Sequence, residues 1–309
     1  MPVRPALTVP AVDIGGRAVL LATDGSPAAA SATRLAQVLA EQRQADIHVL
    51  VVLDMRRSAI PPPLDLALQI ADESVGPGVH AEQEAAVRTG LASTLGRDVS
   101  WPVRMGVGVP AAAIVREAHR IDASLIIMGL RRHSRTDRVL NDETTLNVIR
   151  TSSCPVLGVA PGLEQLPARV LSAMDFTSAS VSASATARAI MDTSGVMTLA
   201  YVPMLPIVAA DDGEGIVHAL GLQAGFEQLE RNLGREGLAL DHVVMHHELG
   251  RPVAELLLEG VDATSAQLIA AGSARPSRVD RWMLGSVSTD LVRDGRCSVL
   301  IVPPAAKRG

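Results

Sequence analysis

Residues 124–129 read SLIIMG and residues 266–272 read AQLIAAG, so one short apolar run that ends in glycine occurs in each half of the chain. The spacing from Gly129 to Gly272 equals the spacing from Cys154 to Cys297, and the two cysteines begin the similar stretches CPVLGV and CSVLIV. Self-similarity at a long, fixed period indicates a duplicated structural unit. The sequence therefore predicts two copies of one domain in tandem.

The length of the chain agrees with this duplication. Its 309 residues are about twice the usual size of a single domain. Residues 161–167 read PGLEQLP, and a proline at each end discourages a helix or a central strand across this segment. We therefore expect a first domain over residues 1–160, a linker over 161–167 and a second domain over 168–309.

The composition excludes several classes of function. Hydrophobic residues make up 48% of the chain and charged residues 20%, which is typical of a globular protein rather than a disordered one. A formal net charge of -5 and only five aromatic residues argue against nucleic-acid binding, which needs phosphate contacts and base stacking. Lys307 is the only lysine, so neither half can use a Walker A lysine or a Schiff-base lysine.

No segment predicts a membrane span or a secretory signal. The longest apolar runs fall far short of the roughly 18 residues that a transmembrane helix needs. The first residues, MPVRPALTVP, are interrupted by three prolines and lack a continuous apolar region. We therefore expect a cytoplasmic protein, in which the reducing environment keeps Cys154 and Cys297 as free thiols.

Short apolar runs alternate with alanine-rich stretches, the pattern that gives a parallel sheet with helices on both faces. In the first copy we predict strands over residues 18–23, 47–53, 99–105, 125–129 and 156–160, and helices over 27–40, 80–95, 110–120 and 142–151. In the second copy we predict strands over residues 170–174, 196–202, 242–247, 267–271 and 298–302. Residues 54–79 form a long connection, either a lid or a mobile segment.

The carboxyl end of the first strand is one candidate site, because ligands of open parallel sheets bind beyond the strand ends where strand order reverses. The first strand of each copy ends near an aspartate, Asp24 in one and Asp175 in the other. Either carboxylate could accept a hydrogen bond from an adenine amino group or a ribose hydroxyl. Capping of the following helix is the alternative, because Asp, Ser and Thr there satisfy free backbone amides.

A second candidate site follows the fourth strand. In the second copy Gly272 ends this strand, and Gly285-Ser286 stands where the last helix should begin. Free amides at a helix start, a glycine that allows close approach and a hydroxyl donor together suit an anion. The sequence thus predicts an anion site at this connection.

These features together resemble the universal stress protein family, and the resemblance spans roughly residues 16–160 and 168–303. ATP-binding members of that family have an aspartate that ends the first strand, the motif G-x2-G-x9-G-[ST] after the fourth strand, and CPV before the last. The resemblance implies two flavodoxin-like, or adenine-nucleotide-hydrolase-like, α/β domains, each with a five-stranded parallel sheet of order 3-2-1-4-5. It also implies an internal pseudo-dimer through the last strands, and it is compatible with a further homodimer.

Neither copy keeps the whole ATP motif. In the first copy Arg132 replaces the second glycine and Asp142-Glu143 replaces the final pair, so two negative charges stand where a phosphate would be held. The basic residues Arg131, Arg132 and His133 could offset these charges by direct contacts. Alternatively, Arg132 pairs with Asp142 and closes the site, which is the interpretation that we prefer.

The second copy keeps more of the motif, since Gly285-Ser286 is present and Arg275 replaces only the second glycine. That arginine either clashes where the family has glycine or swings towards the phosphates and strengthens the site. The resemblance therefore implies that ATP, or a related adenine nucleotide, binds in the second copy if only one copy holds it. The implied site comprises Asp175, Val202, Gly272, Arg275, Gly285, Ser286 and Val287, and the second-choice site comprises Asp24, Gly129, Arg131, Arg132 and His133.

Four candidate metal ligands lie at the predicted third strand of the second copy, namely His242, His246, His247 and Glu248. Residues 242 and 246 share a strand face while 247 points the other way, so we assign no metal to them. Polar residues are common at such a sheet edge. The signatures of zinc proteases, dithiol enzymes and serine hydrolases are also missing from the sequence, which therefore assigns no catalytic residue.

The leading interpretation is a non-enzymatic stress-response or regulatory protein whose conformation or partners respond to a bound adenine nucleotide. A second interpretation is an interaction module in which both sites are degenerate and hold no nucleotide. A third, slow ATP hydrolysis, has the least support, because the sequence shows no Walker motif and no positioned general base beyond the two aspartates.

Overall fold

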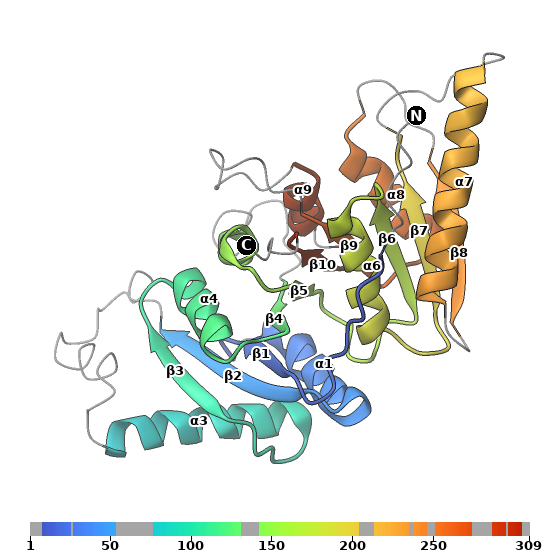
Figure 1. The fold of residues 1–309 in the computed structure, drawn as a ribbon. Coiled ribbons are helices and arrows are strands. Elements are labelled where there is room, and N and C mark those ends of the chain that lie inside the picture. The colour runs from blue at the N-terminus through green and yellow to red at the C-terminus, as the bar shows by residue number, and fades with distance from the viewer. Residues whose placement is uncertain are drawn as a thin grey trace. The chain divides into compact units, whose positions relative to one another are not determined.

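A computed structural model gives the fold of the chain (Figure 1). It describes residues 8–25, 27–53, 77–130, 142–203, 213–234, 238–245, 251–273, 286–294 and 296–304. The chain divides into two compact units. The N-terminal unit comprises Ile14–Leu166, and the C-terminal unit comprises Pro167–Gly309 together with Met1–Asp13.

The N-terminal unit is a five-stranded parallel sheet of order β3-β2-β1-β4-β5, covered by helices. Its strands are β1 (Ala18–Ala22), β2 (Asp46–Leu53), β3 (Val103–Val107), β4 (Leu125–Gly129) and β5 (Val156–Val159). Its described helices are α1 (Pro27–Arg43), α3 (Pro77–Leu95), α4 (Pro110–Arg120) and α5 (Asp142–Thr151). Strand order reverses between β1 and β4, so right-handed crossovers put α1 and α3 on one face and α4 and α5 on the other.

The C-terminal unit repeats this architecture with strand order β8-β7-β6-β9-β10. Its strands are β6 (Arg169–Met174), β7 (Val196–Tyr201), β8 (Ala239–Val244), β9 (Leu268–Gly272) and β10 (Ser298–Val302). Its described helices are α6 (Ser178–Ile190), α7 (Gly213–Leu233), α8 (Val253–Thr264) and α9 (Ser286–Asp294). The predicted α/β class and the order 3-2-1-4-5 are confirmed in each unit.

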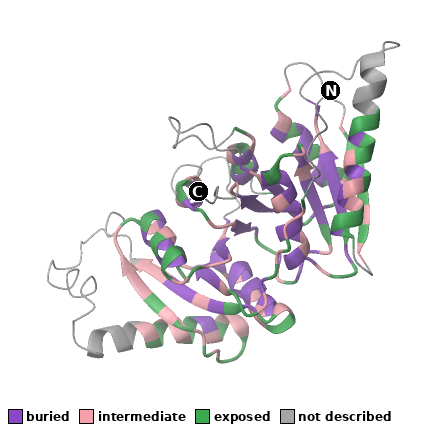
Figure 2. Cartoon of the chain, in the orientation of Figure 1, coloured by how far each residue is buried: buried purple, intermediate pink, exposed green. Residues whose placement is uncertain are grey.

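The central strands are apolar along their whole length because helices cover both of their faces. Leu20 and Leu21 of β1 are fully buried although they point to opposite faces of the sheet, and so are Ile126 and Ile127 of β4. Figure 2 shows the buried residues concentrated in the strands and on the helix faces that cover them. The core of each unit therefore consists of its central strands and the inner faces of its helices.

Prolines and apolar spacing explain where the helices form. Helices α1 and α4 begin at Pro27 and Pro110, where a missing backbone N–H costs no hydrogen bond. Helix α4 buries Ala111, Ile114 and Ala118, which share one helical face. None of the described helices combines the length and the apolar character that a membrane span requires.

The predicted strand over residues 99–105 was wrong in position, because β3 runs over Val103–Val107. Pro102 directly precedes this strand and has no backbone N–H to donate to the sheet. Its carbonyl oxygen accepts a hydrogen bond from the backbone N–H of Val49 at 2.8 Å. The proline therefore fixes the point at which regular pairing with β2 begins.

The predicted strand over residues 242–247 was also displaced, because β8 runs over Ala239–Val244. Its position follows from pairing with β7 along the whole length of that strand. Asp241 and His242 lie inside β8 and are exposed, since β8 is the outer strand of its sheet. A polar outer strand lacks the apolar run by which the buried strands are recognised.

Candidate functional site

The carboxyl ends of the central strands bring the predicted site residues together. In the C-terminal unit β6 ends at Met174 and β9 ends at Gly272, and these strands are hydrogen-bonded parallel neighbours. Asp175 directly follows β6 and therefore lies at the same edge of the sheet as Gly272. In the N-terminal unit Asp24 follows β1, and Gly129 ends the neighbouring strand β4. Each unit thus presents an aspartate and a glycine where its strand order reverses.

Asp175 organises the turn that leads into α6. Its Oδ1 atom accepts hydrogen bonds from the backbone N–H of Thr177 at 2.9 Å and from the Thr177 hydroxyl at 2.6 Å. Thr177 in turn caps α6, because its side-chain oxygen accepts a hydrogen bond from the backbone N–H of Ser180 at 3.3 Å. Asp175 is exposed, and its Oδ2 atom has no hydrogen-bond partner among the described residues. Asp175 therefore supports the helix cap through one of its two carboxylate oxygens.

Gly272 meets a packing requirement that the sequence did not reveal. A β-carbon at residue 272 would lie 2.5 Å from both the carbonyl carbon of Ala179 and the backbone nitrogen of Ser180. Favourable contacts between carbon atoms begin at about 3.5 Å. The first turn of α6 therefore crosses the end of β9 so closely that only glycine fits.

The last helix of each unit begins where the sequence predicted. Helix α9 begins at Ser286, which is exposed, and Val287 follows it in a partly exposed position. Helix α5 begins at Asp142, and Glu143 beside it is exposed. The positive end of the α9 dipole therefore carries a hydroxyl, whereas the positive end of α5 carries acidic residues.

The remaining predicted site residues divide into described and undescribed positions. Val202 directly follows β7 and is partly exposed, and Asp24 is exposed. Five predicted site residues lie outside the described residues, namely Arg275 and Gly285 of the first-choice site and Arg131, Arg132 and His133 of the second.

An aromatic cluster beside Asp175 is the feature of this edge that sequence reasoning missed. The ring centroid of Phe176 lies 5.7 Å from that of Tyr201 and 5.1 Å from that of Phe226. Phe176 adopts a left-handed backbone conformation with φ of 59°, which is uncommon for a residue other than glycine. The one signal in the sequence was this phenylalanine directly after the strand-end aspartate.

His242 belongs to the same aromatic cluster. Its ring stacks on Phe226 with a centroid distance of 4.6 Å, and its Nδ1 lies 2.9 Å from Oε1 of Glu230. The strand β8 ends at Val244, and residues 246–248 lie outside the described residues. Within the described ranges, no group of three or more His, Cys, Asp or Glu side chains could hold a metal ion.

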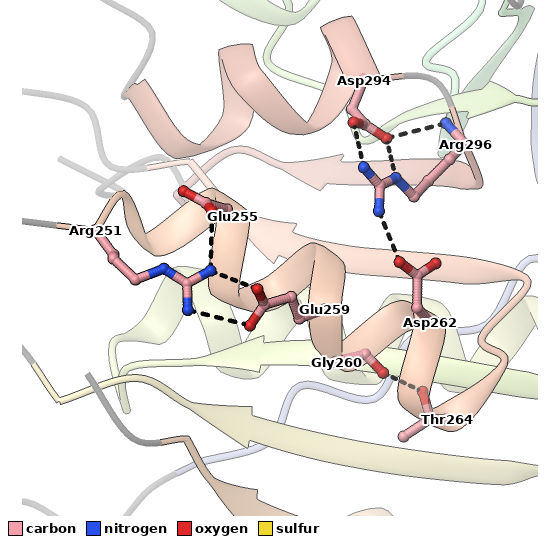
Figure 3. A network of polar contacts seen from close by, with 8 residues as sticks. All are labelled: Arg251, Glu255, Glu259, Gly260, Asp262, Thr264, Asp294 and Arg296. Carbon is pink, nitrogen blue, oxygen red and sulfur yellow. Dashed lines mark hydrogen bonds and ion pairs between the residues drawn. The ribbon is translucent and has the colours of Figure 1, made fainter. Parts of the chain in front are cut away.

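Two arginines of the C-terminal unit, Arg251 and Arg296, form ion pairs with carboxylates in and around α8 (Figure 3). Arg251 donates to two glutamates of α8, and these hydrogen bonds raise the pKa of its guanidinium. Arg296 donates to both carboxylate oxygens of Asp294 and, at 2.7 Å, to Oδ2 of Asp262. The contacts of Arg296 fasten the turn after α9 to α8, and those of Arg251 hold the segment before α8 to the first turns of that helix.

A buried carboxylate of the N-terminal unit also joins two elements through contacts with arginines. Glu117 of α4 accepts hydrogen bonds from Arg120 at 2.9 and 2.6 Å and lies 3.5 Å from the guanidinium of Arg104 in β3. Burial alone would raise the pKa of Glu117, but the hydrogen bonds and charge of Arg120 and the charges of Arg104 and His48 outweigh it, so the pKa is lowered. Glu117 thereby ties α4 to the outer strand β3.

The comparisons with known proteins agree with this architecture. The model of the universal stress protein family matches residues 16–160 and 168–303. A universal stress protein of Methanocaldococcus jannaschii is 27% identical over 141 residues, which are 46% of this chain and 80% of that protein.

Solved structures show the same fold across nearly the whole chain. The structure of a universal stress protein from Archaeoglobus fulgidus matches with a TM-score of 0.64 at 20% identity and covers 94% of this chain and 98% of that one. A structure from Pseudomonas aeruginosa matches with a TM-score of 0.56 at 14% identity and covers 94% of each chain. Because the family model matches both repeats, the chain belongs to the universal stress protein family and carries two of its domains in tandem.

Proposed function

We propose that this member of the family is a non-enzymatic stress-response or regulatory protein that binds ATP, or a related adenine nucleotide, in its C-terminal unit. The observation that carries the proposal is the start of α9, where the exposed Ser286 opens the helix. A helix that connects two parallel strands starts at the carboxyl edge of the sheet, where Asp175 and Gly272 lie. Free amides and a hydroxyl at the positive end of the helix favour a phosphate there.

The N-terminal unit offers a poorer site of the same kind, because Asp142 and Glu143 open α5. A charge at a helix end is worth about 0.3–1 kcal/mol. If each carboxylate replaces the favourable interaction between the helix start and the phosphate by a repulsion of similar size, the pair weakens phosphate binding by roughly tenfold or more. This difference is the reason for placing the nucleotide in the C-terminal unit.

Isothermal titration calorimetry with ATP tests this assignment through an exchange of the two helix starts. The double substitution Gly285→Asp with Ser286→Glu should weaken ATP binding by roughly tenfold or more. The reciprocal substitution, Asp142→Gly with Glu143→Ser, should leave binding intact or add a second site. If the first exchange leaves the affinity unchanged while Asp24→Ala removes it, the nucleotide belongs to the other unit.

A second candidate function is that of an interaction module without nucleotide. The interaction module is favoured because two of the predicted site residues have a structural role. Asp175 accepts hydrogen bonds from Thr177, and Gly272 leaves room for the first turn of α6. Denaturing the purified protein and chromatographing the supernatant separates the two candidates, because released nucleotide supports the first. An empty supernatant together with no heat on ATP titration supports the second. Incubation with labelled ATP addresses slow hydrolysis separately.

We also propose that the two units form an internal pseudo-dimer through β5 and β10, as the family resemblance implies. Each is the last strand of its own unit, and an unpaired outer strand is a liability. The backbone amides of Val156–Val159 and Ser298–Val302 should then resist hydrogen exchange as strongly as those of β4 and β9. Fast exchange in both segments would contradict the arrangement.

A further inference from the structure

The N-terminal unit contains a cavity of about 320 Å³ at the carboxyl end of β1, between α1 and α3. The residues that line it include Gly25 after β1, Val51 of β2 and Gly90 of α3. Because the two units are copies of one fold, the corresponding region of the C-terminal unit shows what this space holds when it is filled.

Gly25 and Phe176 occupy the same position in the two units. Each directly follows the strand-end aspartate, and each has a left-handed backbone conformation, with φ of 69° and 59° respectively. A side chain at residue 25 would therefore leave the backbone as the ring of Phe176 does. Apart from its two chain neighbours, no atom of the described residues would lie within 4 Å of a β-carbon at residue 25. As far as the described residues go, the direction that holds a phenyl ring in the C-terminal unit is thus open in the N-terminal unit.

Val51 and Tyr201 are equivalent by strand register. In the N-terminal unit Ala22, two residues before Asp24, pairs with Leu50, which directly precedes Val51. In the C-terminal unit Ala173, two residues before Asp175, pairs with Ala200, which directly precedes Tyr201. Tyr201 packs against Phe176 with a ring separation of 5.7 Å, whereas the shorter Val51 lines the cavity. Two aromatic side chains of the C-terminal unit therefore correspond to a glycine and a valine in the N-terminal unit.

Each covering helix also has a glycine that faces this space. A β-carbon at Gly225 of α7 would lie 2.7 Å from the ring of Phe176, so the ring explains that glycine. Outside the backbone of its own helix, a β-carbon at Gly90 of α3 would meet no atom of the described part of the chain within 4 Å. Glycine inside a helix is unfavourable relative to alanine, and no ring of the N-terminal unit accounts for Gly90 among the described residues.

We propose that this cavity binds one planar aromatic ring supplied from outside the chain, in the place that Phe176 occupies in the other unit. A cavity of about 150 Å³ is enough for benzene, so the present one can hold a one-ring or two-ring group. Asp24 lines the cavity and is exposed, and its negative charge disfavours an anionic ring. The inference is independent of the proposed nucleotide site, which lies in the other unit.

Indole is a suitable probe, and its binding to the full chain can be followed by two-dimensional NMR of the backbone amides. Saturable shifts are expected at residues that line the cavity, such as Thr23, Gly25 and Gly90. Two substitutions fill the space from different sides, Gly25→Phe from the loop and Gly90→Leu from α3. Each should weaken indole binding by about tenfold or more, because the buried apolar contact is lost.

Gly96→Phe is the matched control. Gly96 has φ of 70°, and a β-carbon there would meet no atom within 4 Å among the described residues other than its chain neighbours. The substitution therefore imposes the same backbone strain as Gly25→Phe but lies outside the cavity lining. It should retain the wild-type affinity for indole. Phe176→Ala is the reciprocal test, since removal of that ring should create a second indole site in the C-terminal unit.

The proposal is overturned if wild-type protein shows no saturable shift with indole, or if a folded Gly25→Phe or Gly90→Leu variant binds indole as tightly as wild type. Either filling variant decides the matter if the other fails to fold. Competition then identifies the source of the ring. Displacement of indole by adenosine points to a free small molecule, and displacement only by N-acetyltryptophanamide points to the side chain of a protein partner. ATP binding to the C-terminal unit should be unaffected by Gly25→Phe, which separates this test from that of the nucleotide site.

Discussion

Replacing Gly272 by alanine should destabilise the C-terminal unit. The new β-carbon would lie 2.5 Å from two backbone atoms of α6, about 1 Å inside favourable contact. Neither atom belongs to a flexible side chain, so the first turn of α6 must move away from β9. Overpacking costs about 1–3 kcal/mol, and a rigid backbone places this case near the upper end. For a unit of this size, that corresponds to a fall in melting temperature of roughly 6–10 °C.

Calorimetric melting of the full chain measures this loss, and hydrogen exchange locates it. Protection should fall in β9 and α6 and remain unchanged in the N-terminal unit. Gly106→Ala is the control, because its β-carbon would meet the nearest atoms at 3.6 Å, an ordinary contact, and should shift stability by less than about 0.5 kcal/mol. If Gly272→Ala melts like wild type, the close approach of α6 is not what requires glycine at this position. If it also loses ATP binding while folded, the glycine serves the ligand instead.

Glu117→Gln should lower the free energy of unfolding by about 1–3 kcal/mol near neutral pH, because it removes the charged partner of Arg120 and Arg104. Since the folded-state pKa of Glu117 lies below its ordinary value of 4.5, this stabilisation is complete above that pH and is lost as the pH falls through the folded-state pKa. Urea unfolding should therefore show a gap between wild type and variant that closes in acid, and a gap independent of pH would contradict the assignment. Burial raises the pKa of both Cys154 and Cys297 to about 12, so iodoacetamide should label neither thiol in the native protein near neutral pH. Both should react after unfolding without reductant, and fewer than two labels would reveal a disulfide.

The sequence located most strands and helices of each unit well because the signals were strong and local, whereas the strand order was implied by the family resemblance. Buried parallel strands must be apolar on both faces, which makes runs such as SLIIMG easy to recognise. The starts of α4, α5 and α9 also followed from local features, a proline in one case and the residues after the fourth strand in the others. The outer strands β3 and β8 were misplaced, since Arg104 and Asp241 interrupt their apolar character.

The packing around the candidate site could not be predicted in the same way. The aromatic cluster joins Phe176, Tyr201 and Phe226 from three separate segments, and the sequence of one segment does not predict that its ring contacts the other two. The clash that requires Gly272 depends on the crossing of α6 over β9, which is a property of the assembled unit. Local sequence therefore identified which residues reach the strand ends, and tertiary contacts decided what surrounds them.

The contrast between Phe176 and Gly25 has a consequence for how the protein responds to heat. In the C-terminal unit Phe176 packs against Tyr201 and Phe226, whereas the N-terminal unit has a cavity of about 320 Å³ at the corresponding place. Lost packing contacts weaken a fold, so two domains of common design need not melt at one temperature. Warming would then unfold the N-terminal unit first, and a ligand bound in its cavity would bring the two transitions closer together.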